Sequence, residues 1–149
     1  MGGETDSMCD RDRGVSKEVS ILSDTAEGRR VQEEIESHLK ANQYSEHEIF
    51  CIRLALEEAM VNAIKHGNHF DRNKKVHISY KVHLNRFDVL IRDEGHGFDP
   101  EDVPDPTAVE NLERPCGRGL MLMRYYMNNV CFNQSGSSVS MTRFRNGQP

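Results

Sequence analysis

The sequence predicts a two-layer α/β sandwich, in which helices cover one face of a mainly antiparallel, mixed sheet. Three observations support this fold class. Apolar and polar residues alternate in the stretches 15–22, 76–84 and 86–95, which is typical of strands with one solvated face. Apolar residues recur at helical spacing in 26–41, 45–67 and 117–128. The 149 residues, 36% hydrophobic and 29% charged, suffice for one domain with its own core.

The first regular element is a short strand over residues 15–22, which we expect at an edge of the sheet. A helix over about 26–41 follows it, with Ser23, Asp24 or Thr25 as its N-cap. The residues before this strand, 1–14, show no periodic apolar pattern, so we expect them to lack fixed structure. The domain is therefore predicted over 15–146.

A long central helix is predicted over residues 45–67. Ser45 followed by Glu48 is a capping-box pattern for its start, and Gly67 is expected at its C-terminal end. Seven apolar residues are spaced as a core-facing surface: Ile49, Ile52, Leu56, Ala59, Met60, Ala63 and Ile64. The helix should therefore be largely buried.

This helix also carries a polar stripe. Glu58 and Asn62 are four residues apart and should lie on one face, with Lys65 and His66 about a turn further on. Taken alone, the stripe fits a hydrogen-bonded pair or a solvated helix edge as well as a functional site. Two glycine-containing motifs downstream favour the functional site.

The next two strands form a predicted hairpin through the tight connection Asn85-Arg86, and they deliver Asp93 to the end of the sheet. Residues 99–116 contain four of the five prolines and no apolar period, as expected of a lid or binding loop. After the helix 117–128, residues 129–145 are predicted to form two strands around Ser135-Gly136.

The two motifs are DEGHGF at residues 93–98 and GRGLML at residues 117–122. A carboxylate followed by alternate glycines marks a backbone that turns tightly and allows close approach of a ligand. Three elements occur in a fixed order: acid-x-x-x-Asn on a helix, Asp-x-Gly-x-Gly-Phe after a strand, and Gly-x-Gly opening a second helix. In this the chain resembles the GHKL (Bergerat-fold) ATPases over residues 16–145, and within them the bacterial anti-sigma-factor serine/threonine kinases.

The resemblance implies that ATP and Mg²⁺ bind here. Asn62 matches the magnesium ligand of the family, and Glu58 matches the general base that accepts a proton from the attacking hydroxyl. Asp93 matches the carboxylate that accepts a hydrogen bond from the adenine amine. The remaining positions that it assigns to the nucleotide are Gly95, Gly97, Phe98, Gly117, Arg118, Gly119 and Leu120.

Three cations near these motifs leave alternatives open. Arg114 matches a lid arginine that contacts the γ-phosphate, but a solvated loop charge is equally compatible with the sequence. Lys65 and His66 follow the stripe of Asn62 and could contact phosphates. A surface lysine and a structural histidine explain them equally well.

The resemblance implies a protein kinase that phosphorylates an anti-anti-sigma-factor antagonist, sequesters a sigma factor and forms a homodimer. Two alternatives remain: a nucleotide-dependent binding module without kinase activity, and a histidine-kinase-like ATPase domain of a two-component system. The second is disfavoured because nothing before Ser45 supplies a helix pair with a phosphorylated histidine.

Composition argues against other classes of protein. A net charge of −5 without long basic runs argues against nucleic acid and anionic membranes as partners. The four cysteines show neither C-x-x-C pairing nor zinc spacing, and no apolar run suggests a signal peptide or membrane segment. We therefore expect a cytoplasmic location.

Overall fold

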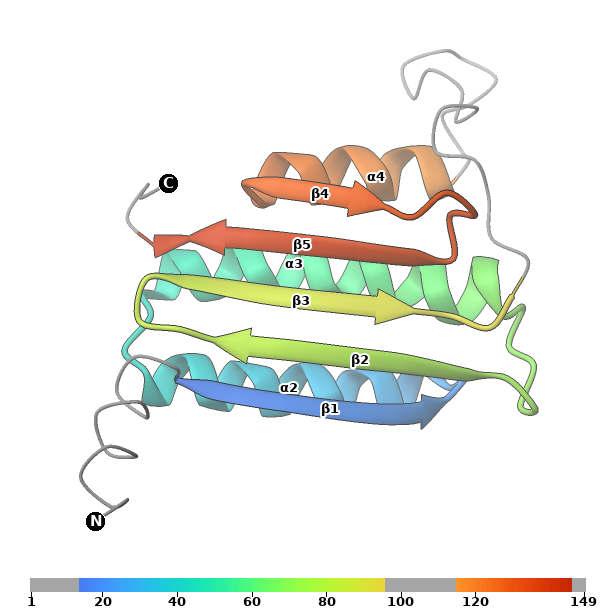
Figure 1. The fold of residues 1–149 in the computed structure, drawn as a ribbon, viewed down its shortest axis with the longest axis horizontal. Helices are drawn as coiled ribbons and strands as arrows, with labels where there is room; N and C mark the ends of the chain where they lie inside the picture. The colour runs from blue at the N-terminus through green and yellow to red at the C-terminus, as the bar shows by residue number, and fades with distance from the viewer. Residues whose placement is uncertain (1–13, 96–114, 146–149) are drawn as a thin grey trace.

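The computed structural model describes residues 14–95 and 115–145, with side chains in the second range from residue 119 onward. Figure 1 shows the arrangement of its helices and strands. In chain order these are β1 (Val15–Leu22), α2 (Thr25–Ala41), α3 (Glu46–Val61), the π-helix η1 (Asn62–Gly67), β2 (Lys75–Val82), β3 (Arg86–Arg92), α4 (Pro115–Tyr126), β4 (Asn129–Phe132) and β5 (Ser138–Phe144).

The strands form one five-stranded sheet in the order β1-β2-β3-β5-β4. The three α-helices lie together on one face of it, with α3 between α2 and α4 (Figure 1). The predicted α/β sandwich with helices on one face is therefore confirmed, as is the edge position of β1. Every described strand pair is antiparallel, so the parallel pairing of a mixed sheet is not found in this part of the chain.

The two faces of the sheet differ as the alternating pattern predicts. On β2, every second side chain points to the helices and is at most 1% exposed: Val76, Ile78, Tyr80 and Val82. The residues between them, His77, Ser79 and Lys81, lie on the opposite, solvated face. The apolar core therefore lies between the sheet and the helices.

The predicted starts of the first two helices are also confirmed. The Asp24 carboxylate caps α2 by accepting a hydrogen bond of 2.8 Å from the backbone N–H of Ala26. At the start of α3, Ser45 and Glu48 form the complete capping box. All seven apolar residues predicted to face the core from the central helix are buried.

The central helix changes its geometry before its end. It is α-helical only to Val61 and continues as a π-helix, in which the backbone N–H of Asn68 bonds to the carbonyl of Ala63. Gly67 is not left-handed; His69 and Phe70 are, with φ of 52° and 59°. The predicted end of the helix at Gly67 is therefore confirmed, but this glycine does not supply a left-handed conformation there.

The other bounds differ slightly from those predicted. Helix α4 begins at Pro115, two residues before the predicted start, and ends at Tyr126. The C-terminal residues form β4 and β5 around Ser135-Gly136, as expected. Within 14–95 and 115–145, no helix has the length and apolar character needed to cross a membrane.

Candidate functional site

The polar stripe of α3 meets the glycine motif of α4. A β-carbon at Gly119 would lie 3.0 Å from Oε2 of Glu58, 3.4 Å from Nδ2 of Asn62 and 3.5 Å from its Oδ1. These three residues are therefore adjacent although α3 and α4 are far apart in the sequence. The missing side chain at Gly119 leaves the carboxylate and the amide room between the two helices.

Glu58 lies in an environment that favours its protonated form. Burial raises the pKa of the Glu58 carboxyl, and the neighbouring charge of Glu57 raises it further. The Glu57 side chain is exposed and lines a groove between α2 and α3, together with Arg53. Of the two adjacent carboxylates, only Glu58 faces Asn62 and Gly119.

Asn62 presents an amide oxygen that is available to a ligand. Its Oδ1 is buried and finds no hydrogen-bond partner among the residues that the structure describes. A buried oxygen without a partner is unfavourable in a folded protein unless something else binds it. A neutral oxygen of this kind fits the few protein ligands that Mg²⁺ takes beside phosphates and water.

A cavity of about 80 Å³ extends from Asn62 to the end of β3. It is lined by Asn62, His66 and Gly67 of η1, by Ile91 and Asp93, and by Ser137 before β5. The contribution of the β4–β5 turn was not predicted. The alternation of apolar and polar residues identifies a strand but not the strands beside it. Only the pairing of β5 with β3 brings Ser137 beside Asp93. The backbone N–H of Asp93 donates to the carbonyl of Ser137 at 2.8 Å.

The carboxylate of Asp93 is held against two glycines. A β-carbon at Gly67 would lie 2.4 Å from Cγ of Asp93, and one at Gly95 would lie 1.9 Å from the carbonyl oxygen of Gly67. A side chain at either position would clash with these atoms, which explains why both residues are glycine. Burial raises the pKa of Asp93, although the hydrogen bond from the Gly95 N–H, at 2.9 Å, and the charge of Lys74 act in the opposite direction.

Of the two basic residues Lys65 and His66, only His66 lines the cavity. The Nε2 atom of His66 is buried without a hydrogen-bond partner in the described part of the chain, and burial lowers the pKa of this imidazole. His66 is therefore neutral near neutral pH. Lys65 is exposed and does not line the cavity.

Comparison with known proteins identifies the family. The sequence matches the family described as histidine kinase-like ATPase domain over residues 21–143. The chain belongs to this family. The resemblance to GHKL ATPases is thereby confirmed.

Two individual proteins are similar in sequence to this histidine kinase-like ATPase domain. The domain is 34% identical to the serine-protein kinase RsbW of Bacillus subtilis (strain 168) over 112 residues. This aligned region covers 70% of each chain. The domain is also 32% identical over 102 residues to the anti-sigma F factor of Oceanobacillus iheyensis, covering 64% of this chain and 69% of that protein.

A solved structure supports the fold. The RsbU and RsbW domains of Rv1364c from Mycobacterium tuberculosis match with a TM-score of 0.60 and 13% sequence identity, over 88% of this chain and 32% of that one. At this identity the likeness concerns the fold alone.

The remaining residues predicted to bind the nucleotide lie either in α4 or outside the described residues. Gly97, Phe98 and Arg114 lie outside the described residues, as do most of the predicted lid and residues 1–13. Gly117 and Arg118 belong to the first turn of α4. Leu120 is 7% exposed and therefore packs in the interior.

Proposed function

We propose that this chain is an ATP-dependent serine/threonine protein kinase of the anti-sigma-factor type, formed by residues 15–146. It phosphorylates an anti-anti-sigma-factor antagonist and sequesters a sigma factor. The observation that carries this proposal is the meeting of Glu58, Asn62 and Gly119, because it joins a proton acceptor, a metal ligand and a phosphate-loop glycine at one place. The printed names of the relatives, a serine-protein kinase and an anti-sigma factor, support the finer assignment.

In the proposed complex the adenine enters the cavity beside Asp93, whose carboxylate accepts a hydrogen bond from the adenine amine. The phosphates extend toward α4, where backbone N–H groups of the first turn have no partner within the helix and favour anions. Gly117 lies in this turn, and Arg118 and Arg114 are the proposed cationic contacts. His66 contributes a neutral imidazole.

Asn62 is the proposed ligand for magnesium, through the unpartnered Oδ1. Magnesium held there would supply positive charge that offsets the negative charge of the phosphates. The role of Asn62 is to hold its amide oxygen at one turn's distance from Glu58. A neutral ligand there avoids a second negative charge beside the phosphates and the Glu58 carboxylate.

Glu58 is the proposed general base. The hydroxyl oxygen of the substrate serine or threonine attacks the γ-phosphorus, the bond to the β,γ-bridging oxygen breaks, and the hydroxyl proton passes to the Glu58 carboxylate. Burial raises the pKa of Glu58, which makes its ionised form a stronger base than an exposed carboxylate. The products are a phosphorylated protein and ADP.

The test is incubation with labelled ATP, magnesium and antagonist-like proteins from the same genome. We expect label on serine or threonine of one antagonist, identified by mass spectrometry. Binding without transfer would favour a sequestering module. Transfer to histidine would favour the two-component branch.

Nucleotide binding is tested separately by calorimetry. We expect magnesium-dependent binding of ATP and ADP and much weaker binding of GTP. Asp93→Asn should lose most of the affinity, since its amide turns a donor toward the adenine amine. Asn62→Ala should reduce the magnesium-dependent part, and normal binding of Mg·ATP by this variant would refute the role of Asn62.

A further inference from the structure

We propose that Asn68 is a positioning residue, which holds the carboxylate of Asp93 in the orientation that reads the adenine amine. This inference rests on the proposed function, because it concerns how the same site selects its base. Asn68 does not line the cavity itself. It acts through the residue that follows Asp93.

The side chain of Asn68 is 0% exposed and uses both ends of its amide. Its Nδ2 donates to the hydroxyl oxygen of Ser23 at 2.9 Å and to the carbonyl oxygen of Lys75 at 3.0 Å. Its Oδ1 accepts the backbone N–H of Glu94 at 2.8 Å. The orientation of the amide follows from its partners, because a carbonyl needs a donor and an N–H needs an acceptor.

This one amide connects the segments on both sides of the cavity. Asn68 directly follows η1, which supplies Asn62, His66 and Gly67 to the cavity wall. Its partner Glu94 directly follows Asp93. The bond therefore sets the distance between the end of the central helix and the carboxylate at the end of β3.

The space around Asp93 leaves little freedom to compensate for a shift. The Asp93 carboxylate lies against the α-carbon of Gly67, and the Gly95 backbone lies against the Gly67 carbonyl. The Asp93 carboxylate also accepts the Gly95 N–H at 2.9 Å. Movement of the Glu94 backbone thus moves its neighbours Asp93 and Gly95 relative to Gly67, against which the carboxylate lies.

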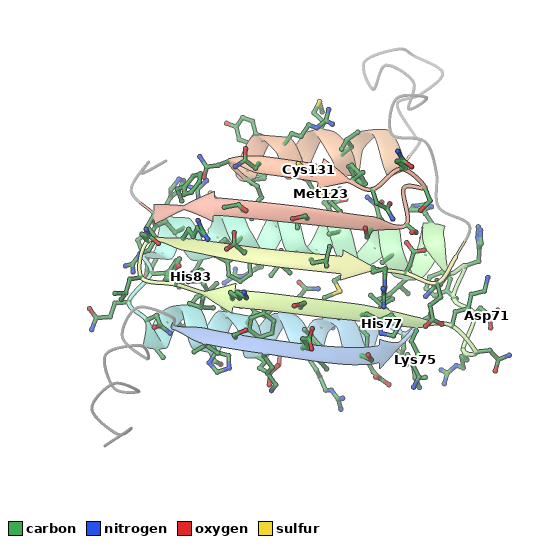
Figure 2. All side chains as sticks on the ribbon, in the orientation of Figure 1. Asp71, Lys75, His77, His83, Met123 and Cys131 are labelled. Atoms are coloured by element: carbon green, nitrogen blue, oxygen red, sulfur yellow. The ribbon has the colours of Figure 1, made fainter. Side chains whose placement is uncertain are left out.

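The other contacts of Glu94 tie it to the sheet rather than to the helix. Its carboxylate accepts the backbone N–H of Lys75 at 2.9 Å and pairs with Nε2 of His77 at 2.7 Å. Lys75 and His77 lie at the beginning of β2 (Figure 2), and His77 is paired with Arg92 at the end of β3. Loss of the Asn68 side chain therefore leaves Glu94 on the sheet while releasing it from η1.

The experiment compares the affinities of ATP and inosine triphosphate, which carry the same phosphates and sugar but differ at the group that faces Asp93. Asn68→Ala should lower the preference for ATP by roughly five- to tenfold, the value of one net hydrogen bond, with little change in affinity for inosine triphosphate. A purely structural role would weaken both nucleotides equally. Asn68→Ser is made in parallel, so that a folded variant is available if the alanine variant does not fold.

Ser23→Ala is the matched control, because it removes another partner of the same buried amide and leaves the bond to Glu94. It should lower stability without changing the preference for ATP. In the background of Asp93→Asn, Asn68→Ala should have no further effect on this preference. An unchanged preference in the folded Asn68 variants, or an equal loss in Ser23→Ala, would overturn the inference. If the wild-type protein bound ATP without preferring it, the assignment of Asp93 itself would fail and the inference with it.

Discussion

Three titratable side chains at the candidate site share one physical feature. Burial raises the pKa values of Glu58 and Asp93 and lowers that of His66, so that in each case the uncharged form is favoured. Groups held in this way reduce stability when they ionise, and they cluster at functional sites more often than elsewhere. Stability therefore favours the uncharged carboxyl groups, whereas the proposed roles of Glu58 and Asp93 require the ionised carboxylates.

The first prediction separates chemistry from binding. Glu58→Gln retains the size of the side chain but cannot accept a proton, so phosphotransfer should fall by roughly 10² to 10⁴ while nucleotide affinity stays near that of the wild type. Single-turnover kinetics and calorimetry measure the two effects. Glu57→Gln is the matched control on the adjacent, exposed position, and its effect should be mild. Equal losses in both variants would mean that the helix face is wrongly assigned.

The same variant predicts a pH dependence of stability. The folded-state pKa of Glu58 is raised above its unfolded value, so its contribution to stability is fully present below the unfolded pKa and is lost as the pH rises through the folded pKa. Glu58→Gln should therefore be more stable than the wild type near neutral pH, and this advantage should shrink as the pH falls to about 4. Urea denaturation measures this difference. A Glu58→Gln protein less stable than the wild type near neutral pH would contradict the argument.

At the scale of elements, the central helix combines two geometries. Its α-helical part places Glu58 and Asn62 one turn apart, and the change to a π-helix at Asn62 alters the positions of the residues that follow. π-Helical turns are rare and often occur at functional sites. Here the π-helix contributes His66 and Gly67 to the cavity while Lys65 stays in solvent.

The start of this helix offers a test of stability without a change in activity. Ser45→Ala removes the side chain that accepts the Glu48 N–H at 3.1 Å, and should lower the free energy of unfolding by about 1 kcal/mol. Ser37→Ala is the control, because Ser37 is exposed inside α2, where alanine is a better helix former. It should be neutral or slightly stabilising. Chemical denaturation compares the two, and equal destabilisation would argue against the capping box.

The end of the helix offers a test of nucleotide binding. Gly67→Ala places a β-carbon 2.4 Å from the Asp93 carboxylate group, which must then move, so nucleotide affinity should fall by roughly tenfold or more, a loss of about 1.4 kcal/mol. Gly28→Ala is the control, since its β-carbon would meet Cδ1 of Ile64 at 3.2 Å, away from Asp93. Calorimetry on the folded variants measures the difference. Wild-type affinity in Gly67→Ala would show that Asp93 has no fixed place in binding.

At the scale of the whole molecule, the proposed kinase must recognise proteins as well as a nucleotide. In the described part of the chain, helices cover one face of the sheet (Figure 1), and the other face carries the polar side chains of β2. We expect the substrate protein to dock beside the predicted lid, residues 99–116. The serine or threonine hydroxyl that is to be phosphorylated must reach Glu58. We also expect a homodimer, as the family resemblance implies.

Competition between partners tests this expectation. A matched sigma factor should form a complex with the purified protein, and the unphosphorylated antagonist should displace it, because both occupy the same module. With Mg·ATP, phosphorylation of the antagonist should restore the sigma complex. Size-exclusion chromatography with light scattering measures the complexes and the oligomeric state, and Glu58→Gln serves as the control that binds without transfer. Simultaneous binding of both proteins would contradict competition.

Local patterns in the sequence determined most of the elements and the family. Alternation within β2, the capping box at Ser45 and the helical spacing of apolar residues each involve side chains within about four positions, so the chain segment alone decides them. The three motifs in their fixed order identified the ATPase fold in the same way, because each motif is short and contiguous.

Only the tertiary structure decided how these segments meet. The approach of Gly119 to Glu58, the place of Ser137 beside Asp93 and the fit of Asp93 against Gly67 all join residues distant in sequence, and they depend on strand order and helix packing. Asn68 is the clearest case. In the sequence it is one polar residue after a helix, where exposure is the ordinary expectation, and it is buried because three segments that converge in space supply the partners that its amide requires.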